Sequence, residues 1–438
     1  MPYTYPKGED LFYLAAMANN WADLAIEHQD PDVLDEVKKL AEQIKAATER
    51  IKNLPGNKEL AAAEPNDLEG IFALAPKHRT YPENKLPEDY KKRLTGAVIG
   101  RTAGCILGAI VEGYEIEYMK AWAAHHGDAF PPEDYFSAAP GMPGTVRYTK
   151  SKNEEYLKQN LKICPVDDDI GYMQLALLIL EEYGCDFTTN DVGKAWAKYL
   201  PMAYTAEEVA LNNVKAGIDG MHAAEGENPY TNLIGGAIRA DGWGYVCPGN
   251  PERAAVLAYR DAYLTHRRTG LYGEMYFAAV IAAAFRCKTP FEALYEGLNF
   301  IPENSLMAKT VRWALEYRKN ITDYQSARDA VDKKFYGMPI AHTLSNACLI
   351  IFALQIGGKD YSKVISECVA MGMDNDCTTA TAGSIFGAVY GIDAIDPKWY
   401  RPFNGRMDSY FNGVGPFEFT DFVDRYAKQA EKMLENLG

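Results

Sequence analysis

This 438-residue chain has only eight cysteines, and no two of them are spaced like the ligands of a zinc site. A chain of this length can bury a sizeable core, so it does not need disulfide bridges to be stable. These observations exclude a small disulfide-stapled domain and a cysteine-based zinc site. They indicate free thiols in a reducing compartment.

An excess of positive charge is also missing. The chain has 45 Lys and Arg residues against 60 Asp and Glu residues, which gives a net charge of −15. Surfaces that bind nucleic acids or anionic membranes are usually basic. We therefore expect neither as a partner, whereas so many carboxylates suit divalent cations.

No long apolar run marks a membrane span or a secretion signal. The best membrane candidate, residues 94–111, is interrupted by Arg101 and is barely long enough to cross a bilayer. The first ten residues, MPYTYPKGED, have neither the basic nor the apolar region of a signal peptide. The sequence therefore predicts a cytoplasmic protein.

Alternating apolar and polar runs, which indicate β-strands, are hard to find. Apolar residues instead recur every three or four positions, as in VLDEVKKLAEQIKAATERIKNL (33–54) and MYFAAVIAAAFR (275–286). Prolines and polar residues mark a junction between 55 and 90. We predict an all-α protein with a helical N-terminal extension over residues 1–90 and one large helical domain over 91–438.

Two of the predicted helices carry a glycine at every fourth position. Glycine inside a helix costs about 1 kcal/mol relative to alanine, and residues four apart form one ridge of a helix. A ridge of glycines allows another backbone to come unusually close, and it would hold the ends of the helices in a fixed relation. The two ridges are Gly96, Gly100, Gly104 and Gly108, and Gly383, Gly387 and Gly391.

Adjacent aspartates stand at the start of two apolar helices. One motif, CPVDDDIGYMQLALLIL, contains Asp167, Asp168 and Asp169, and the other, MGMDNDCTTATAGSIFGAVYG, contains Asp374 and Asp376. A single aspartate at such a position is explained by capping of the free N–H groups and by the helix dipole. Adjacent carboxylates repel one another unless protons or a cation intervene. Each cluster is therefore open to two interpretations, helix capping or the binding of a hard cation such as Mg²⁺, Mn²⁺ or Ca²⁺.

A further carboxylate, Glu112, follows the first glycine-rich helix. The helix dipole disfavours a negative charge at a C-terminal end, so Glu112 is harder to explain as a capping residue.

Three motifs, taken in order, resemble the signatures of the ADP-ribosylglycohydrolase family, which includes the dinitrogenase reductase-activating glycohydrolases. They are GAVIGRTAGCILGAIVEG (96–113), VDDDIGYMQLAL (166–177) and GMDNDCTTATAGSIFGAVYG (372–391). The resemblance covers roughly residues 93–425. It implies a compact orthogonal bundle of helices with a binuclear Mg²⁺ or Mn²⁺ site between helix ends. It also implies hydrolysis of the N- or O-glycosidic bond at the anomeric carbon of an ADP-ribosyl group.

The resemblance also implies which residues bind the metal ions and which act in catalysis. The implied metal ligands are Asp167, Asp168, Asp169, Asp374, Asp376 and Cys377. Asp168 and Asp374 also belong to the implied catalytic set. Its third member, Glu112, is either a general base that positions water or a further metal ligand.

Two of these positions depart from the family pattern. Asp167 stands where the family has threonine, which adds a charge. Cys377 replaces a hydroxyl oxygen by sulfur, a softer and poorer ligand for Mg²⁺. That change favours Mn²⁺, or leaves only the Cys377 backbone as a ligand.

Other matched positions concern the substrate. Gly235 and Gly236 match a glycine-rich loop that binds the pyrophosphate in the family, although Ile234 replaces the preceding asparagine. His266 matches a histidine that faces the substrate. Taken alone, a histidine beside two arginines is equally well explained as a residue at the edge of the core.

Further side chains near this loop are open to two interpretations each. Arg239 suits either a phosphate contact or an ion pair with the nearby Asp241. Trp243, Tyr245 and Tyr272 suit either stacking on a base or packing in the core.

Three functions are consistent with the sequence. The first is a metal-dependent hydrolase acting on a protein-linked or small-molecule ADP-ribosyl group. The second keeps the fold but cleaves a nucleoside or another small N-riboside, and the departures at Cys377 and Ile234 give it weight. The third is a non-catalytic protein like the lens crystallins of the family, which the retention of both aspartate clusters opposes. The native metal and the oligomeric state stay open.

Overall fold

The computed structural model describes residues 8–76, 85–138 and 154–435. The chain forms two compact units. One unit comprises Met1–Ala62 with Asp332–Pro339, and the other comprises Ala63–Val331 with Ile340–Gly438. The boundary at residue 90 that we expect from the sequence stays a prediction.

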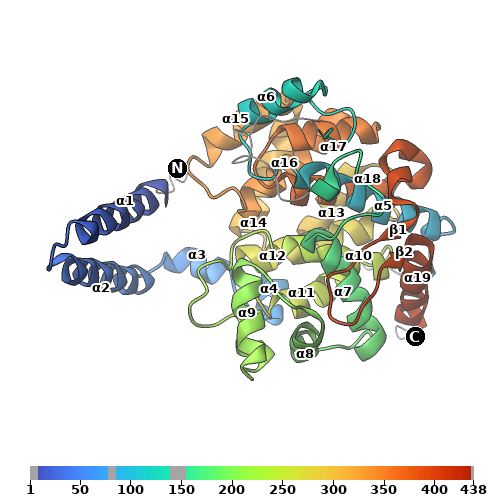
Figure 1. The fold of residues 1–438 in the computed structure, drawn as a ribbon. Helices are drawn as coiled ribbons and strands as arrows, with labels where there is room; N and C mark the ends of the chain where they lie inside the picture. Colours follow the sequence, from blue (N-terminus) through green and yellow to red (C-terminus); the bar gives the residue numbers. More distant parts are fainter. Residues whose placement is uncertain (1–7, 77–84, 139–153, 436–438) are drawn as a thin grey trace. The chain divides into compact units, whose positions relative to one another are not determined.

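The first unit is built on a helical hairpin (Figure 1). Its helices are α1 (Gly8–Glu27) and α2 (Val33–Lys52), which contact each other, followed by the short α3 (Lys58–Ala63). Helix α2 has apolar residues at helical spacing, yet none of its residues is buried. Large side chains such as Trp21 and Ile51 are more than half exposed.

Helices make up nearly all the regular secondary structure described in the second unit, which confirms the all-α prediction. Its described strands, β1 (Arg406–Met407) and β2 (Phe417–Glu418), form one short antiparallel pair. Its helices are α4 (Leu68–Leu74), α5 (Tyr90–Ala109), α6 (Ile116–His126), α7 (Asp168–Tyr183), α8 (Thr189–Tyr199), α9 (Thr205–Lys215), α10 (Ala240–Val246), α11 (Pro251–Ala262), α12 (Thr269–Ala284), α13 (Pro290–Gly297), α14 (Leu306–Tyr317), α15 (Tyr324–Lys334), α16 (Thr343–Gly357), α17 (Tyr361–Ala370), α18 (Asn375–Tyr390) and α19 (Phe419–Glu435).

Local sequence signals explain where several of these helices begin. The side chain of Asn250 accepts a hydrogen bond from the backbone N–H of Arg253, and Pro251 occupies the first turn of α11. Thr289 and Pro290 start α13 in the same way. The first residues of these two helices are therefore set by a capping hydrogen bond and a proline within the same short segment.

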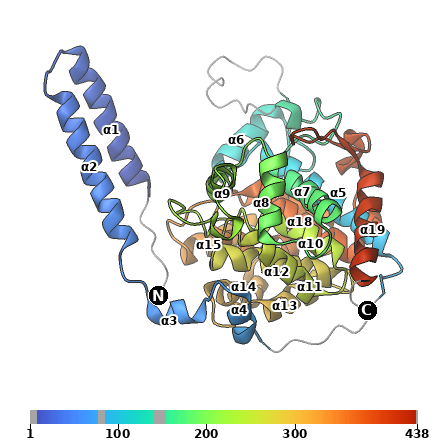
Figure 2. The same ribbon diagram turned by 90° about the horizontal axis from the view of Figure 1, so that it is seen from below.

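Helices that are apolar on all sides form the core of the second unit. Every residue of α12 is buried, as expected for a helix without a polar face. The blue α5 and the orange α18, far apart in the sequence, lie side by side in two perpendicular views (Figures 1 and 2). Residues 94–111, the best membrane candidate, include most of α5. No helix within the described ranges is long and apolar enough to cross a membrane.

The two glycine ridges pack against each other, and the predicted close approach is confirmed. A methyl group added at Gly96 would lie 2.6 Å from the carbonyl carbon of Gly391, and one added at Gly108 would lie 2.5 Å from the amide nitrogen of Asp376. The helices run antiparallel, so the end of α5 lies beside the start of α18. The ridges thus bring the region of Glu112 next to the second aspartate cluster.

Candidate active site

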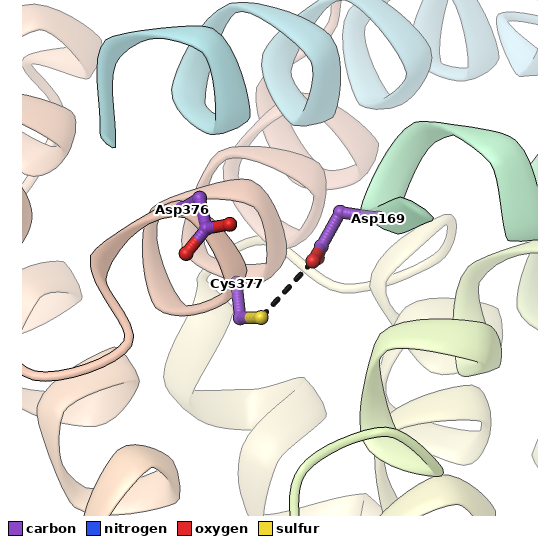
Figure 3. Close-up of side chains that lie close together, drawn as sticks. All are labelled: Asp169, Asp376 and Cys377. Carbon is purple, nitrogen blue, oxygen red and sulfur yellow. Dashed lines mark hydrogen bonds between the residues drawn. The ribbon is translucent and has the colours of Figure 1, made fainter. Parts of the chain in front are cut away.

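Acidic side chains from three helix ends form one continuous cluster where α5 ends and α7 and α18 begin. Within each of three overlapping groups, the possible ligand atoms lie within 4.8 Å of one another. These groups are Glu112, Asp374 and Asp376; Asp167, Asp168 and Asp169; and Asp169, Asp376 and Cys377. Figure 3 shows the third group, in which Asp169 of α7 faces two side chains of α18. The structure therefore brings all the predicted metal ligands together with Glu112.

The two aspartate clusters differ in how well capping explains them. Asp167 is the N-cap of α7, and its Oδ1 accepts a hydrogen bond from the backbone N–H of Asp169 at 3.0 Å. Asp374 is the N-cap of α18 but its side chain makes no capping bond. The Oδ1 atoms of Asp374 and Asp376 are buried, and neither has a hydrogen-bond partner in the described parts of the chain. Buried carboxylate oxygens without partners are costly, and a cation would satisfy them.

An unusual turn positions the start of α18. Gly372 and Met373 both have positive φ angles, +71° and +65°, and such a conformation is costly for Met373. The backbone N–H of Gly113 donates a hydrogen bond to the carbonyl oxygen of Met373 at 2.9 Å. This bond ties the segment that carries Glu112 to the loop that presents Asp374.

Asp169 is held by protein groups on both of its carboxylate oxygens. Its Oδ1 lies 3.0 Å from Nη2 of Arg101, and its Oδ2 accepts a hydrogen bond from the Cys377 thiol at 3.0 Å (Figure 3). Arg101 is fully buried and also pairs with Asp241 at 2.6 Å. The guanidinium thus links α5, α7 and α10 behind the acidic cluster. The assignment of Asp169 as a metal ligand stays a prediction.

The carboxylates of the cluster hold protons more tightly than usual. Loss of hydration raises the pKa of Glu112 to about 7, and the nearby charges of Asp374 and Asp167 add to this shift. Burial raises the pKa of Asp167 to about 6. Burial, together with Glu112 and other carboxylates, also raises the pKa of Asp376 well above its ordinary value. The cluster is therefore short of positive charge, and its mainly oxygen donors fit a hard divalent cation.

The cluster opens into a cavity of about 660 Å³. Seven carboxylates line it: Glu112, Glu155, Asp167, Asp168, Glu207, Asp374 and Asp376. The rest of the lining includes Cys377 and four tyrosines. Among the described residues, no Lys, Arg or His lines this cavity. Its size suits a small-molecule ligand.

The predicted substrate residues are placed less uniformly. Gly235 lines the cavity, whereas Gly236, Arg239, His266 and Tyr272 are not among the lining residues. All four are buried. Nothing in this placement tests their contact with a substrate, which stays a prediction.

Arg239 forms ion pairs, but Asp241 is not its partner. Its guanidinium lies 2.5 Å from Glu207, 2.6 Å from Asp261 and 3.0 Å from Glu274. The ion-pair alternative for Arg239 is therefore correct in kind but wrong in its partner, since Asp241 pairs with Arg101 of α5.

The aromatic and histidine side chains near Arg239 also have protein partners. Nδ1 of His266 lies 2.6 Å from Oγ1 of Thr265. The Tyr272 hydroxyl donates a hydrogen bond to the carbonyl oxygen of Pro65. Trp243 and Tyr245 are buried in the core and do not line the cavity.

Several lining residues were not anticipated from the sequence. They are Glu155, Glu207 and the tyrosines Tyr156, Tyr172, Tyr204 and Tyr410. Tyr172 stands four residues after Asp168 on α7, so helical spacing could have identified it. The others come from segments with no motif, and only the tertiary fold brings them to the cavity.

Comparison with known proteins places the chain in a family. The profile of the ADP-ribosylglycohydrolase family matches residues 86–431. Among solved structures 44 chains match, and one of them is described as an "ADP-ribosylglycohydrolase-related protein complex". It is 19% identical with a TM-score of 0.51, and the match covers 80% of this chain and 99% of that chain, which supports the fold alone. No curated protein sequence matches the chain.

Proposed function

We propose that this chain, which belongs to the ADP-ribosylglycohydrolase family, is a metal-dependent hydrolase of the glycosidic bond at the anomeric carbon of a ribosyl group. The family implies an ADP-ribosyl group as the substrate. One observation carries the proposal: Asp374 and Asp376 line a cavity together with Glu112 and Asp168, and each has a buried Oδ1 atom without a hydrogen-bond partner among the described residues.

The acidic cluster is the proposed site of two divalent cations, Mg²⁺ or Mn²⁺. Asp167, Asp168, Asp374 and Asp376 line the cavity and are the first choice as ligands. Cys377 also lines the cavity, Asp169 adjoins it, and these two residues complete the predicted set of six ligands. Bound cations at this position would orient the ribose hydroxyls and make water a better nucleophile near neutral pH.

Glu112 is proposed to accept a proton from the attacking water. A general base works best when its pKa lies near the working pH, and the pKa of Glu112 is raised to about 7. Its side chain is exposed to the cavity, where a water molecule can reach it. The alternative role, as a metal ligand, predicts that Glu112→Gln loses cation affinity. The base role predicts that the variant keeps cation affinity and loses turnover.

A second candidate is hydrolysis of a nucleoside or other small N-riboside at the same site. The observation that favours it is the cavity lining, which contains seven carboxylates and, within the described ranges, no cationic side chain for a diphosphate. A non-catalytic role is the least supported of the three, because a scaffold has no need of buried carboxylates that repel one another. The cytoplasmic location expected from the sequence stays a prediction.

The direct test is metal removal and return. Protein dialysed against EDTA should release no ribosyl product from ADP-ribosylated arginine or from a nucleoside panel, and added Mn²⁺ or Mg²⁺ should restore release. Ca²⁺-loaded protein controls for a purely structural effect of a divalent ion. Turnover that is indifferent to the chelator would overturn the proposed mechanism.

A further inference from the structure

We infer that the cavity selects a riboside whose leaving group is uncharged or cationic, and that it discriminates against a diphosphate. The inference rests on the proposed function in one respect, that the ribosyl group lies at the acidic cluster. It concerns the remainder of the cavity, whose lining includes Glu155, Met202, Glu207, Gly235 and the four tyrosines Tyr156, Tyr172, Tyr204 and Tyr410.

The first argument is the charge of the lining. Seven carboxylates line the cavity, and its described part has no Lys, Arg or His. Seven ionised carboxylates carry seven negative charges, whereas two divalent cations carry four positive charges. The lining would therefore stay negative even with both cations bound. A diphosphate entering such a cavity meets repulsion that no cationic side chain among the described lining residues offsets.

The second argument concerns the place where a pyrophosphate would bind. Gly235 belongs to the predicted phosphate loop, but a methyl group added to it would lie 2.5 Å from Oε2 of Glu207. A phosphate that approached the Gly235 backbone would therefore meet a carboxylate. Arg239 does not cancel this charge, because its single guanidinium is shared with Asp261 and Glu274 as well.

The third argument concerns the N-terminus of α9, whose first residues line the cavity. A free helix N-terminus would attract a phosphate. Here the first turn carries Glu207 and Glu208, and the Thr205 hydroxyl donates a hydrogen bond to Oε2 of Glu207 at 3.3 Å. The partial positive charge of the helix end is thus already matched by its own carboxylates.

The lining also shows what the cavity can accept. Tyr204 and Met202 are 58% and 49% exposed, and Tyr156, Tyr172 and Tyr410 also line the cavity. Aromatic faces bind flat apolar rings and attract cations. Together with the carboxylates, they suit an uncharged or positively charged ring system attached to ribose.

Binding measurements test this inference independently of turnover. Isothermal titration of the Mn²⁺-loaded full-length protein would compare nicotinamide riboside, which is cationic, with its 5′-phosphate, and adenosine with ADP-ribose. We expect each phosphorylated ligand to bind at least about tenfold more weakly than its partner. Phosphorylated ligands that bind as tightly or more tightly would overturn the inference, as would the absence of riboside binding. Riboside binding without hydrolysis would instead contradict the proposed function alone.

Charge-neutral variants locate the discrimination. Glu207→Gln should reduce the penalty for the phosphorylated ligands several-fold, whereas Glu208→Gln, which alters an exposed neighbour outside the lining, should not. Because Glu207 is buried against Arg239, its variant can fail to fold. Glu155→Gln then provides the test, since Glu155 lines the cavity and is exposed. An unchanged penalty in a folded Glu207 or Glu155 variant would contradict this source of selectivity.

Discussion

The thiol of Cys377 donates a hydrogen bond to Oδ2 of Asp169, with 3.0 Å between sulfur and oxygen. Arg101 holds the other oxygen of the same carboxylate at 3.0 Å. A soft sulfur thus stands beside the carboxylates of the proposed metal site, whose other predicted side-chain ligands are oxygens. Its position makes the metal preference of the site open to experiment.

Cys377→Ser should shift the metal preference towards Mg²⁺. The hydroxyl can keep the hydrogen bond to Asp169 and offers an oxygen in place of sulfur, which is the poorer ligand for Mg²⁺. We expect the ratio of Mn²⁺ to Mg²⁺ affinity to fall about tenfold, comparable with the effect of changing a group that supports a metal ligand. Titration calorimetry of the metal-free protein measures both affinities. Cys287→Ser is the control, and an unchanged ratio would show that the sulfur does not influence the metal.

Asp374→Asn should abolish turnover and leave the fold intact. The substitution removes the charge of a carboxylate that lines the cavity and whose buried Oδ1 has no hydrogen-bond partner among the described residues. We expect kcat to fall by more than the roughly 10–100-fold that follows loss of a group supporting a ligand. The melting temperature of the metal-free variant should equal or exceed that of the wild type, because burial raises the pKa of this carboxyl group in the native state.

Asp424→Asn is the matched control for that substitution, since the side chain of Asp424 is largely exposed on α19. Steady-state kinetics with saturating Mn²⁺ and circular dichroism decide the result. Full turnover in a folded Asp374→Asn protein would remove Asp374 from the site.

The stability of the metal-free protein should fall as the pH rises. The pKa of Glu112 is raised from 4.5 to about 7 and that of Asp167 from 3.8 to about 6. At pH values between the ordinary and the raised pKa of each group, the native state binds more protons than the unfolded chain. The free energy of unfolding therefore decreases as the pH rises through this range. The melting temperature in EDTA should therefore drop between pH 5 and pH 8.

Saturating Mn²⁺ should reverse this drop, because the cation replaces the protons and binds only the native state. Glu112→Gln should flatten the profile measured in EDTA. A melting temperature that rises with pH in EDTA would contradict the raised pKa values.

Gly100→Ala should strongly destabilise the second unit. A methyl group at this position would overlap the carbonyl group of Gly383, and backbone atoms cannot move aside as a flexible side chain can. We expect a loss of about 3 kcal/mol in the free energy of unfolding, at the upper end for overpacking. Gly415→Ala is the control, because nothing lies within 4 Å of the added methyl group. Equal urea midpoints for the two variants would show that the ridge tolerates a side chain.

The features that could be predicted were those that depend on nearby residues. Periodic apolar positions predicted helices, and a spacing of four predicted the glycine ridges of α5 and α18. Adjacent aspartates predicted an acidic site, because neighbouring carboxylates repel each other in any fold unless a cation or protons neutralise them. The family motifs then indicated that these separate segments meet.

The contacts of Arg239 and the cavity lining could not be predicted in this way. Glu207, Asp261 and Glu274 stand on three different helices, and only tertiary packing brings them to one guanidinium. Arg101 interrupts an apolar run, which counted against a membrane span but gave no hint of its two buried carboxylate partners. Tyr410 reaches the cavity from an irregular segment near the C-terminus, where no periodicity exists to interpret.

The direct backbone contact between α5 and α18 also bears on how the proposed metal site is assembled. Because the two helices touch along their length, the acidic residues at their ends are assembled when the chain folds and not when an ion arrives. A cation that binds there would find the carboxylates of both helix ends already in place.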